Sequence, residues 1–272
     1  MSLDLSIVVA DAEDLRIKDC VASIDEDVEV VVSLNGATQQ LRKMIDTLSV
    51  KACLSEERGL AMALNRGIDC ARHEKIVVVD SDCYFEKGTV RKLWNSLSSN
   101  EMVRGTVIYT HEGILTELVA KARNYHANPQ PSPGETIRAY KPLGFHKQIR
   151  GRLGGYFYDE DLKLSEDYEM DYRRQAAKIP LIYIPDAIIR HTPISPFKDL
   201  RSAFRYGLDR HTSVSKGLVK PKKHFTQSLR KLRERGLSRL GTPGLMYMIL
   251  WTVAYDLGYH AQKFFDVNGV KK

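Results

Sequence analysis

Two aspartates separated by one residue follow an unbroken β-branched run in the segment KIVVVDSD, residues 75–82. Such a run is typical of a parallel strand that is covered on both faces. In open α/β sheets, ligands bind just outside the carboxyl ends of the strands. There, Asp80 and Asp82 would offer hard oxygen ligands to a divalent cation, which in turn can neutralise a diphosphate. The alternative is a strand-to-helix turn in which the two aspartates only cap backbone N–H groups.

Two further carboxylates and a histidine occur downstream. A helix is predicted over residues 165–178, with Ser165 as its N-cap and Glu166 and Asp167 in its first turn. A carboxylate in that position is suited to act as a general base, although the helix dipole alone also favours acids there. His191 ends an extended segment and is either a metal ligand or an ordinary core or surface histidine.

Strands must alternate with helices to position these groups, and the first two thirds of the chain has that pattern. Predicted strands cover residues 6–10, 28–33, 75–79 and 102–109, and predicted helices cover residues 39–48, 60–71 and 89–97. This alternation predicts an α/β fold, a doubly wound and mostly parallel sheet flanked by helices.

The pattern changes after the fourth predicted strand. Residues 127–134 contain three prolines and a glycine and are predicted to form a loop. Residues 181–184 and 188–191 are predicted as two short extended pieces bracketed by prolines. Beyond Pro196 the chain reads as helical, with one apolar stripe formed by Phe197, Leu200, Phe204 and Leu208.

The segment Glu57–Asp82, ERGLAMALNRGIDCARHEKIVVVDSD, resembles the nucleotide-sugar-binding region of family 2 glycosyltransferases with the GT-A fold. Members of that family typically have a basic residue and a glycine, then an Ala-x-Asn-x-Gly-Ile helix, and then a strand that ends in D-x-D. The matching residues are Arg58, Gly59, Ala63, Asn65, Gly67, Ile68, Asp80 and Asp82.

Two more segments match in the same order. Residues 154–173, GGYFYDEDLKLSEDYEMDYR, resemble the family's G-G-F-D-E, then E-D, then Arg pattern, with Glu166 and Asp167 at the E-D positions. Residues 184–191, IPDAIIRH, resemble its closing strand that ends in His. The resemblance implies a catalytic domain over residues 1–195. Its nucleotide-sugar-binding half is residues 1–110, its acceptor-binding half is residues 111–195, and a basic helical region follows over residues 196–272.

The resemblance implies an inverting glycosyltransferase that moves a sugar from a nucleoside-diphosphate sugar to an acceptor hydroxyl. It implies Mn²⁺ or Mg²⁺ on Asp82 and His191, with Asp80 on the ribose or in the metal shell, to stabilise the leaving diphosphate. Asp167, with Glu166, is the implied base. A single base implies inversion, because a retaining reaction needs a second carboxylate as nucleophile. The implied donor-binding residues are Ala10, Asp11, Asn35, Arg58, Asn65, Asp80, Ser81, Gly154 and Gly155.

Two departures from the family pattern bear on the donor. The loop after the first strand is Ala10-Asp11-Ala12-Glu13, where the family has Thr or Asn, and the second strand ends at Asn35, where the family has Asp. UDP is expected because it is the family's commonest carrier. Tyr140, Lys141 and His146 are expected to approach the pocket, with no role assigned.

Charge is distributed unevenly along the chain. Residues 196–272 hold 16 Lys/Arg against 5 Asp/Glu, whereas residues 1–195 hold 25 against 29. A basic region of this kind binds a polyanion or forms a solvated helical face. The apolar stretch over 245–257 is too short to span a bilayer, which needs about 20 apolar residues. Together with the basic run before it, over residues 216–259, it either lies on an anionic membrane surface or packs on the catalytic body. We expect a cytoplasmic protein, peripheral on the inner membrane face, with a lipid-linked or cell-surface acceptor.

Other classes fit less well. A sugar-phosphate nucleotidyltransferase has a glycine-rich loop after its first strand, and residues 10–14 contain no glycine. A non-enzymatic polyanion or nucleic-acid binder would interleave aromatics with its charges, but residues 216–239 contain only Phe225. The four cysteines form no C-x-x-C pair, which disfavours zinc ribbons and redox dithiols and favours a reducing compartment. The N-terminal segment does not read as a signal peptide.

Overall fold

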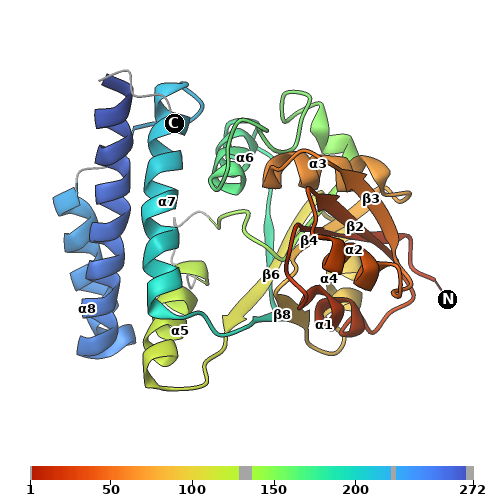
Figure 1. Ribbon diagram of the computed structural model, residues 1–272, viewed down its shortest axis with the longest axis horizontal. Coiled ribbons are helices and arrows are strands. Elements are labelled where there is room, and N and C mark those ends of the chain that lie inside the picture. The colour runs from red at the N-terminus through yellow and green to blue at the C-terminus, as the bar shows by residue number, and fades with distance from the viewer. Residues whose placement is uncertain (1, 129–136, 222–224, 268–272) are drawn as a thin grey trace. The chain divides into compact units, whose positions relative to one another are not determined.

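The computed structural model describes residues 2–128, 137–221 and 225–267, with the backbone alone for 225–239 and 267. Most of the predicted loop over 127–134 therefore lies outside the described residues. Contacts divide the chain into two compact units (Figure 1): unit 1 comprises residues 1–108 and 130–191, and unit 2 comprises residues 109–129 and 192–272. The catalytic and C-terminal domain boundaries drawn from the sequence stay a prediction.

Unit 1 is built on an eight-stranded sheet with the order β3-β2-β1-β4-β7-β6-β8-β5. The first four strands in this order run parallel, whereas β7 is antiparallel to β4, β6 to β7 and β5 to β8. The expected α/β class is thus confirmed. The strands are β1 Leu5–Asp11, β2 Glu29–Asn35, β3 Lys51–Ser55, β4 Lys75–Asp80, β5 Cys83–Phe85, β6 Met102–Tyr109, β7 Leu143–His146 and β8 Ile182–His191.

The parallel core of the sheet is buried on both faces. Successive side chains of each strand point to opposite faces, and both sets are buried, as is typical of parallel strands. Val8, Val31 and Val78 pack in one cluster with the apolar face of α3. The alternate side chains, such as Ile7 and Val77, are also fully buried. The helices of unit 1 are α1 Ile17–Ala22, α2 Gln39–Ile45, α3 Leu60–Cys70, α4 Thr89–Leu97, the 3₁₀ helix η1 Lys147–Arg150 and α6 Glu166–Ala176.

The sheet register brings the polar strand ends together. Ala10 at the end of β1 lies opposite Asp80 at the end of β4. His191, the last residue of β8, lies opposite Cys83, the first residue of β5. Because β5 follows the Asp80–Asp82 turn directly, the last residue of β8 comes next to that turn. The pairing of β5 with β8 therefore carries a histidine from far along the chain to the aspartates.

One expected break in secondary structure is wrong. The prolines around residues 181–191 predict two short extended pieces, but the structure has one continuous strand, β8, which runs through Pro185. Proline lacks the N–H that a ladder needs, yet the Pro185 carbonyl still accepts a hydrogen bond of 2.8 Å from the Thr106 hydroxyl of β6. That contact holds the strand where the ladder donor is missing.

The described residues of unit 2 form the helices α5 Ile114–Ala127, α7 Pro196–Ser215 and α8 Phe225–Val267, the last interrupted at Gly241 (φ 63°, ψ 176°). Helices α7 and α8 approach very closely. A Cβ built on Gly207 would lie 2.0 Å from the carbonyl oxygen of Tyr255, and one on Gly258 would lie 2.0 Å from that of Phe204. Among the described residues, no helix is both long and apolar enough to cross a bilayer.

The apolar stripe predicted on α7 is partly buried. Leu200 packs against the core of unit 2, where Asp199 also accepts hydrogen bonds from Arg123 of α5 (2.5 Å) and Tyr247 of α8 (2.7 Å). Phe197, which the same spacing assigns to the stripe, is 78% exposed. It lies in the first turn of α7.

The structure joins Cys53 of β3 to Cys70 at the end of α3 in a disulfide, with 6.7 Å between the Cα atoms. A separation of 17 residues makes no local motif, so the C-x-x-C criterion could not reveal this pair. Cys20 and Cys83 are free and buried.

We predict that Gly67→Ala destabilises the protein although alanine favours a helix. A Cβ at this position would lie 2.6 Å from Val8 Cγ1 and 3.2 Å from Ser33 Cβ, both in buried strands. Overpacking of this kind costs about 1–3 kcal/mol. This exceeds the stability that alanine adds over glycine through its higher helix propensity. Chemical denaturation should reveal the loss. The matched control is Gly151→Ala, since Gly151 has φ −60° and open space around its Cβ position. Equal stability of the two variants would contradict the close approach of α3 to the sheet.

Candidate functional site

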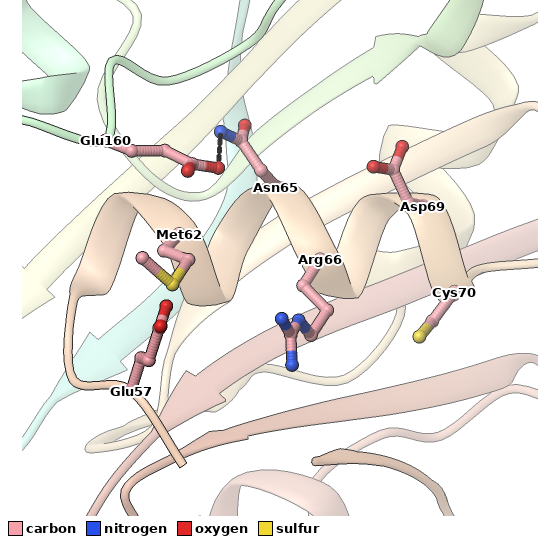
Figure 2. A pocket seen from close by; sticks show the side chains of 7 residues that line it. All are labelled: Glu57, Met62, Asn65, Arg66, Asp69, Cys70 and Glu160. Carbon is pink, nitrogen blue, oxygen red and sulfur yellow. Dashed lines mark hydrogen bonds between the residues drawn. The ribbon is translucent and has the colours of Figure 1, made fainter. Parts of the chain in front are cut away.

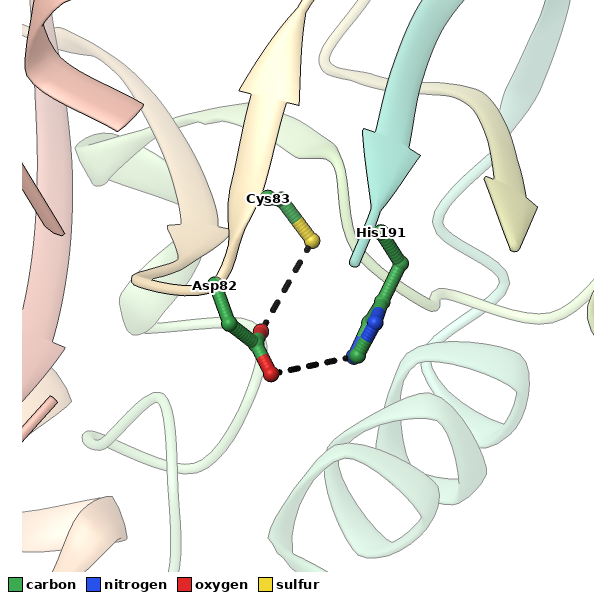
Figure 3. A group of neighbouring side chains, drawn as sticks. All are labelled: Asp82, Cys83 and His191. Carbon is green, nitrogen blue, oxygen red and sulfur yellow. Dashed lines mark hydrogen bonds and ion pairs between the residues drawn. The ribbon is translucent and has the colours of Figure 1, made fainter. Parts of the chain in front are cut away.

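Asp82 lies at the centre of a small group of possible ligands in unit 1 (Figure 3). Its Oδ2 atom is 3.3 Å from Nε2 of His191, and its Oδ1 atom is 4.0 Å from Sγ of Cys83. The side chains of Asp82 and His191 are 19% and 12% exposed. One ligand atom from each of the three residues lies within 4.8 Å of the others.

The donor set fits a divalent cation. A carboxylate oxygen and an imidazole nitrogen suit Mn²⁺, and a partly buried carboxylate also suits Mg²⁺. Burial raises the pKa of the Cys83 thiol well above its ordinary value, so this residue is a protonated and weak donor. Burial also raises the pKa of Asp82. A bound cation would offset that desolvation by favouring the ionised carboxylate.

Two basic side chains lie beside the aspartates, and the sequence motifs assign a role to neither of them. Arg16, from the segment between β1 and α1, has Nη2 at 3.4 Å from Asp82 Oδ2 and also pairs with Asp14. Lys141 donates from Nζ to Asp80 Oδ1 over 2.6 Å. Burial by itself would raise the pKa of Asp80, but Lys141 brings it below its ordinary value. Each aspartate of the pair therefore has a different cationic partner.

The two acids at the start of α6 differ in burial. Glu166 is 3% exposed, and its Oε2 atom has no hydrogen-bond partner among the described residues. Burial, followed by the charge of Asp167, raises the pKa of Glu166 to about 8. Asp167 is half-buried and accepts a hydrogen bond of 2.6 Å from the backbone N–H of Tyr168. Burial raises its pKa to about 6, although the charge of Lys141 opposes the rise.

Arg173, at the arginine position of the family pattern, ties α6 to the glycine-rich loop before it. Its guanidinium donates to the backbone carbonyls of Leu153, Tyr156 (2.9 Å) and Phe157 (2.7 Å). It also pairs with Glu169 one turn earlier, through Nε at 2.5 Å. The loop inside this clamp contains Gly154 and Gly155 with φ of +89° and +96°, conformations that favour glycine.

The ends of β1 and β2 present oxygen atoms. Asp11 Oδ1 accepts from three successive backbone N–H groups, those of Ala12, Glu13 and Asp14, at 2.6–3.0 Å. Its Oδ2 atom is buried without a hydrogen-bond partner of normal geometry among the described residues. Burial raises the pKa of Asp11, although the nearby hydroxyl of Ser81 lowers it.

At the end of β2, the side-chain amide of Asn35 is oriented by a hydrogen bond of 3.1 Å from Nδ2 to the carbonyl of Gly59. Exposed Arg58 reaches back from Nη2 to the carbonyl of Gly36 over 3.5 Å. The loop before α3 thus closes against the end of β2.

Asn65 contacts the glycine-rich segment rather than the aspartates. Its Nδ2 donates to the carbonyl of Tyr158 over 2.8 Å, and its Oδ1 accepts from the N–H of the same residue over 3.1 Å. Figure 2 shows a further hydrogen bond to Glu160, 3.0 Å long, at the rim of a pocket of about 520 Å³. The pocket is lined by Glu57, Met62, Asn65, Arg66, Asp69, Cys70 and Glu160.

The structure therefore gathers some expected residues and separates others. Asp80, Asp82 and His191 lie together at the ends of β4 and β8, and electrostatic interactions connect Asp80 with Asp167 and Glu166 through Lys141. Asn35 and Arg58 form a second group, and Asn65 with the glycine loop forms a third. No described contact joins these groups to Asp82.

Comparisons with known proteins identify the family and the fold of the chain. The family model of glycosyl transferase family 2 matches residues 7–151, and the chain belongs to this family. Among solved structures, it is similar to the mannosyltransferase PcManGT from Pyrobaculum calidifontis, in complex with GDP-Man and Mn²⁺. The TM-score is 0.56 at 17% identity, covering 100% of this chain and 77% of that one.

The fold is also similar to that of S. aureus TarS 1-349. That comparison has a TM-score of 0.52 at 16% identity and covers 99% of this chain and 92% of that one. At these identities the likeness establishes the fold, and the expected GT-A architecture is confirmed. Curated protein sequences give no match. The chain is a glycosyltransferase by its family and fold.

Glu166→Gln should stabilise the protein, and more so at high pH. Because the pKa of Glu166 in the folded protein, about 8, lies above its ordinary value of 4.5, the folded protein keeps a proton that the unfolded chain releases in this interval. The free energy of unfolding therefore falls as the pH rises from about 4.5 to about 8. The variant has no carboxyl group to ionise here, so its stability does not fall in this way. Its free energy of unfolding above pH 8 should exceed that of the wild type by roughly 2–4 kcal/mol.

Denaturant unfolding near pH 5, about 6.5 and about 8.5 measures that gain. The matched control is Glu112→Gln, because Glu112 is an exposed glutamate. A stability difference between Glu166→Gln and wild type that is equal at all three pH values would contradict a buried, protonated Glu166.

Proposed function

We propose that this glycosyltransferase moves a sugar from a nucleoside-diphosphate sugar to an acceptor hydroxyl with inversion, and that residues 1–195 carry the reaction. The observation that carries this proposal is the pairing of Asp82 with His191 at the carboxyl end of the sheet. The half-buried carboxylate of Asp167 also interacts electrostatically with Lys141 and Asp80. PcManGT, with the same fold, has been solved with GDP-Man and Mn²⁺, which supports a nucleotide-sugar donor and a divalent metal.

Asp82 and His191 would hold the metal, Mn²⁺ or Mg²⁺. Their oxygen and nitrogen atoms are already 3.3 Å apart. Asp80, whose Oδ1 is bonded to Lys141, would contact the ribose or the metal shell. When bound, the metal supplies positive charge against the leaving diphosphate.

Asp167 is the better candidate for the general base. A base must be ionised at the working pH and must reach the acceptor. Glu166, with a pKa of about 8 and 3% exposure, is protonated at neutral pH and covered. Asp167, with a pKa of about 6, is ionised at pH 7 and only half-buried. It would accept the proton of the attacking hydroxyl, and one such base is consistent with inversion.

The proposed nucleobase is uracil. With Nδ2 of Asn35 engaged by Gly59, the amide presents its Oδ1 atom, so this asparagine offers an acceptor like the family's aspartate. Asp11 Oδ2 is a second acceptor at the neighbouring strand end. Uracil offers one N–H donor, which the Oδ1 atom of Asn35 alone can accept. Guanine offers adjacent N–H groups that would use both acceptors, so GDP is the competing carrier. Ala10, Arg58, Ser81, Gly154 and Gly155 complete the proposed donor site, with Asn65 acting through the loop that it holds.

Thermal unfolding with UDP, GDP, CDP or ADP, each with and without Mn²⁺, tests the donor site. One nucleotide should stabilise the wild type only when the metal is present, by roughly 2.7 kcal/mol at 100 times its dissociation constant. Asp82→Ala should abolish this response because it removes a metal ligand. Asp167→Asn is the matched variant. It should keep the nucleotide response but lose about 100-fold or more in turnover, because only proton transfer is affected.

No response to any of the four nucleotides, or an undiminished response in Asp82→Ala, would overturn the donor and metal assignments. Full turnover in Asp167→Asn would overturn the base assignment alone.

We further propose that unit 2 binds an anionic membrane surface and that the acceptor is lipid-linked or lies at the membrane. One face of α8 carries exposed apolar side chains at helical spacing, and residues 196–272 are strongly basic. An exposed apolar helix face in a region whose sequence is strongly basic is typical of helices that lie in a membrane interface. The exposed residues are Met246, Ile249, Leu250, Val253, Leu257 and Phe264.

Sedimentation with vesicles rich in phosphatidylglycerol tests this surface. The protein should bind these vesicles at low salt and bind pure phosphatidylcholine much less, because charge and apolar burial both contribute. Replacing Leu250 and Leu257 by glutamine should weaken binding by about tenfold or more. Leu54→Gln, at another exposed leucine, should have no effect. Equal binding of all variants, or no binding, would count against the membrane proposal.

A further inference from the structure

Lys141 lies two residues before the start of β7, the strand that pairs with β4, and β4 ends at Asp80. Its Nζ atom is 2.6 Å from Asp80 Oδ1. The lysine side chain is 10% exposed, whereas that of Asp80 is 43% exposed. The ion pair therefore lies at the open edge of the sheet, with the lysine stem covered by protein and the carboxylate facing solvent.

The surroundings of Lys141 keep it charged. Burial lowers the pKa of this lysine, but the charges of Asp80 and Glu166 outweigh it and raise the pKa above its ordinary value. The same ammonium also opposes the rise that burial causes in the pKa of Asp167. Lys141 is thus a permanent cation within electrostatic range of the aspartate pair and of the start of α6.

We propose that Lys141 is a donor-binding residue whose ammonium group contacts the diphosphate of the nucleotide sugar, beside the metal held by Asp82 and His191. This inference rests on the proposed function and adds a ligand to the same site. Lysine serves elsewhere as a point charge for phosphate. A fixed cation aimed at developing charge needs no reorganisation when the leaving group departs.

Charge balance favours this role over a purely structural one. A diphosphate brings negative charge into a space that already holds the carboxylates of Asp80, Asp82 and Asp167. One divalent cation and Arg16, which lies 3.4 Å from Asp82, offset only part of this repulsion, whereas Lys141 adds a further positive charge that is independent of the metal. A partly buried lysine–aspartate pair contributes little stability by itself, because desolvation offsets the attraction. Folding alone therefore gives little reason for a lysine at this position.

The test compares Lys141→Met, which keeps the length of the side chain without its charge, with Lys141→Arg, which keeps the charge. The matched control is Lys92→Met, because it removes a lysine paired with Asp186 elsewhere in unit 1. The ligands are Mn²⁺ alone, and uridine, UDP, guanosine and GDP with saturating Mn²⁺. Isothermal calorimetry on the full chain gives the affinities, and circular dichroism verifies folding.

In Lys141→Met the affinity for the preferred nucleoside diphosphate should fall about tenfold or more. The affinities for Mn²⁺ alone and for the nucleoside should not fall, because neither contact includes the diphosphate. Lys141→Arg should retain most of the diphosphate affinity, and Lys92→Met should behave as wild type. This pattern separates a phosphate contact from a structural role, which would weaken all ligands together.

Unchanged diphosphate affinity in Lys141→Met would overturn the inference while leaving the proposed function intact. Parallel loss of metal, nucleoside and diphosphate binding would also overturn it, in favour of a structural lysine. If Lys141→Met does not fold, Lys141→Arg decides. A loss of affinity in Lys141→Arg that is confined to the diphosphate supports the contact, whereas an equal loss of nucleoside and diphosphate affinity overturns it. Wild-type protein that binds neither UDP nor GDP with Mn²⁺ would overturn the proposed function itself.

Discussion

The crowding of carboxylates at the carboxyl end of β4 is the constraint on which the rest of the site depends. Each acid is accommodated in a different way. Asp80 pairs with Lys141, Asp82 contacts His191 and Arg16, and Glu166 is held as a neutral acid by burial. Because like charges at short range destabilise one another, these arrangements are interdependent. Removing one cation would change the protonation of several acids together. The site is better regarded as one charge system than as a list of ligands.

The family-pattern residues that do not contact these charged groups fix the position of the helices and loops around them. Gly67 lets α3 approach β1 and β2, Asn65 joins α3 to the backbone of Tyr158, and Arg173 joins α6 to the glycine loop. All three contacts involve backbone or a missing Cβ, for which few other residue types substitute. Residues shared across a family can therefore be needed for the geometry of the site without contacting a ligand.

The sequence was informative where chemistry is encoded locally. The β-branched run before Asp80 predicted a buried parallel strand, and the D-x-D, E-D and terminal His patterns predicted the acids and the histidine. Lys141 and Arg16 were assigned no role because isolated basic residues outside the matched motifs have no local signature, and only the packing of β7 and of the segment after β1 brings them to the aspartates. The Cys53–Cys70 pair and the continuity of β8 through Pro185 likewise depend on contacts between distant segments.

The start of α6 illustrates why residue type alone does not assign a catalytic role. Glu166 and Asp167 are adjacent, carry the same functional group and share the same helix dipole. Successive residues of a helix point about 100° apart, so the side chain of Glu166 is buried in the core whereas that of Asp167 is half-buried. Burial then separates their pKa values by about two units, to about 8 and about 6. At neutral pH one is an acid and the other a base. The direction of α6, which Arg173 anchors, therefore decides how deeply each carboxylate is buried and which of the two suits the proposed role of base.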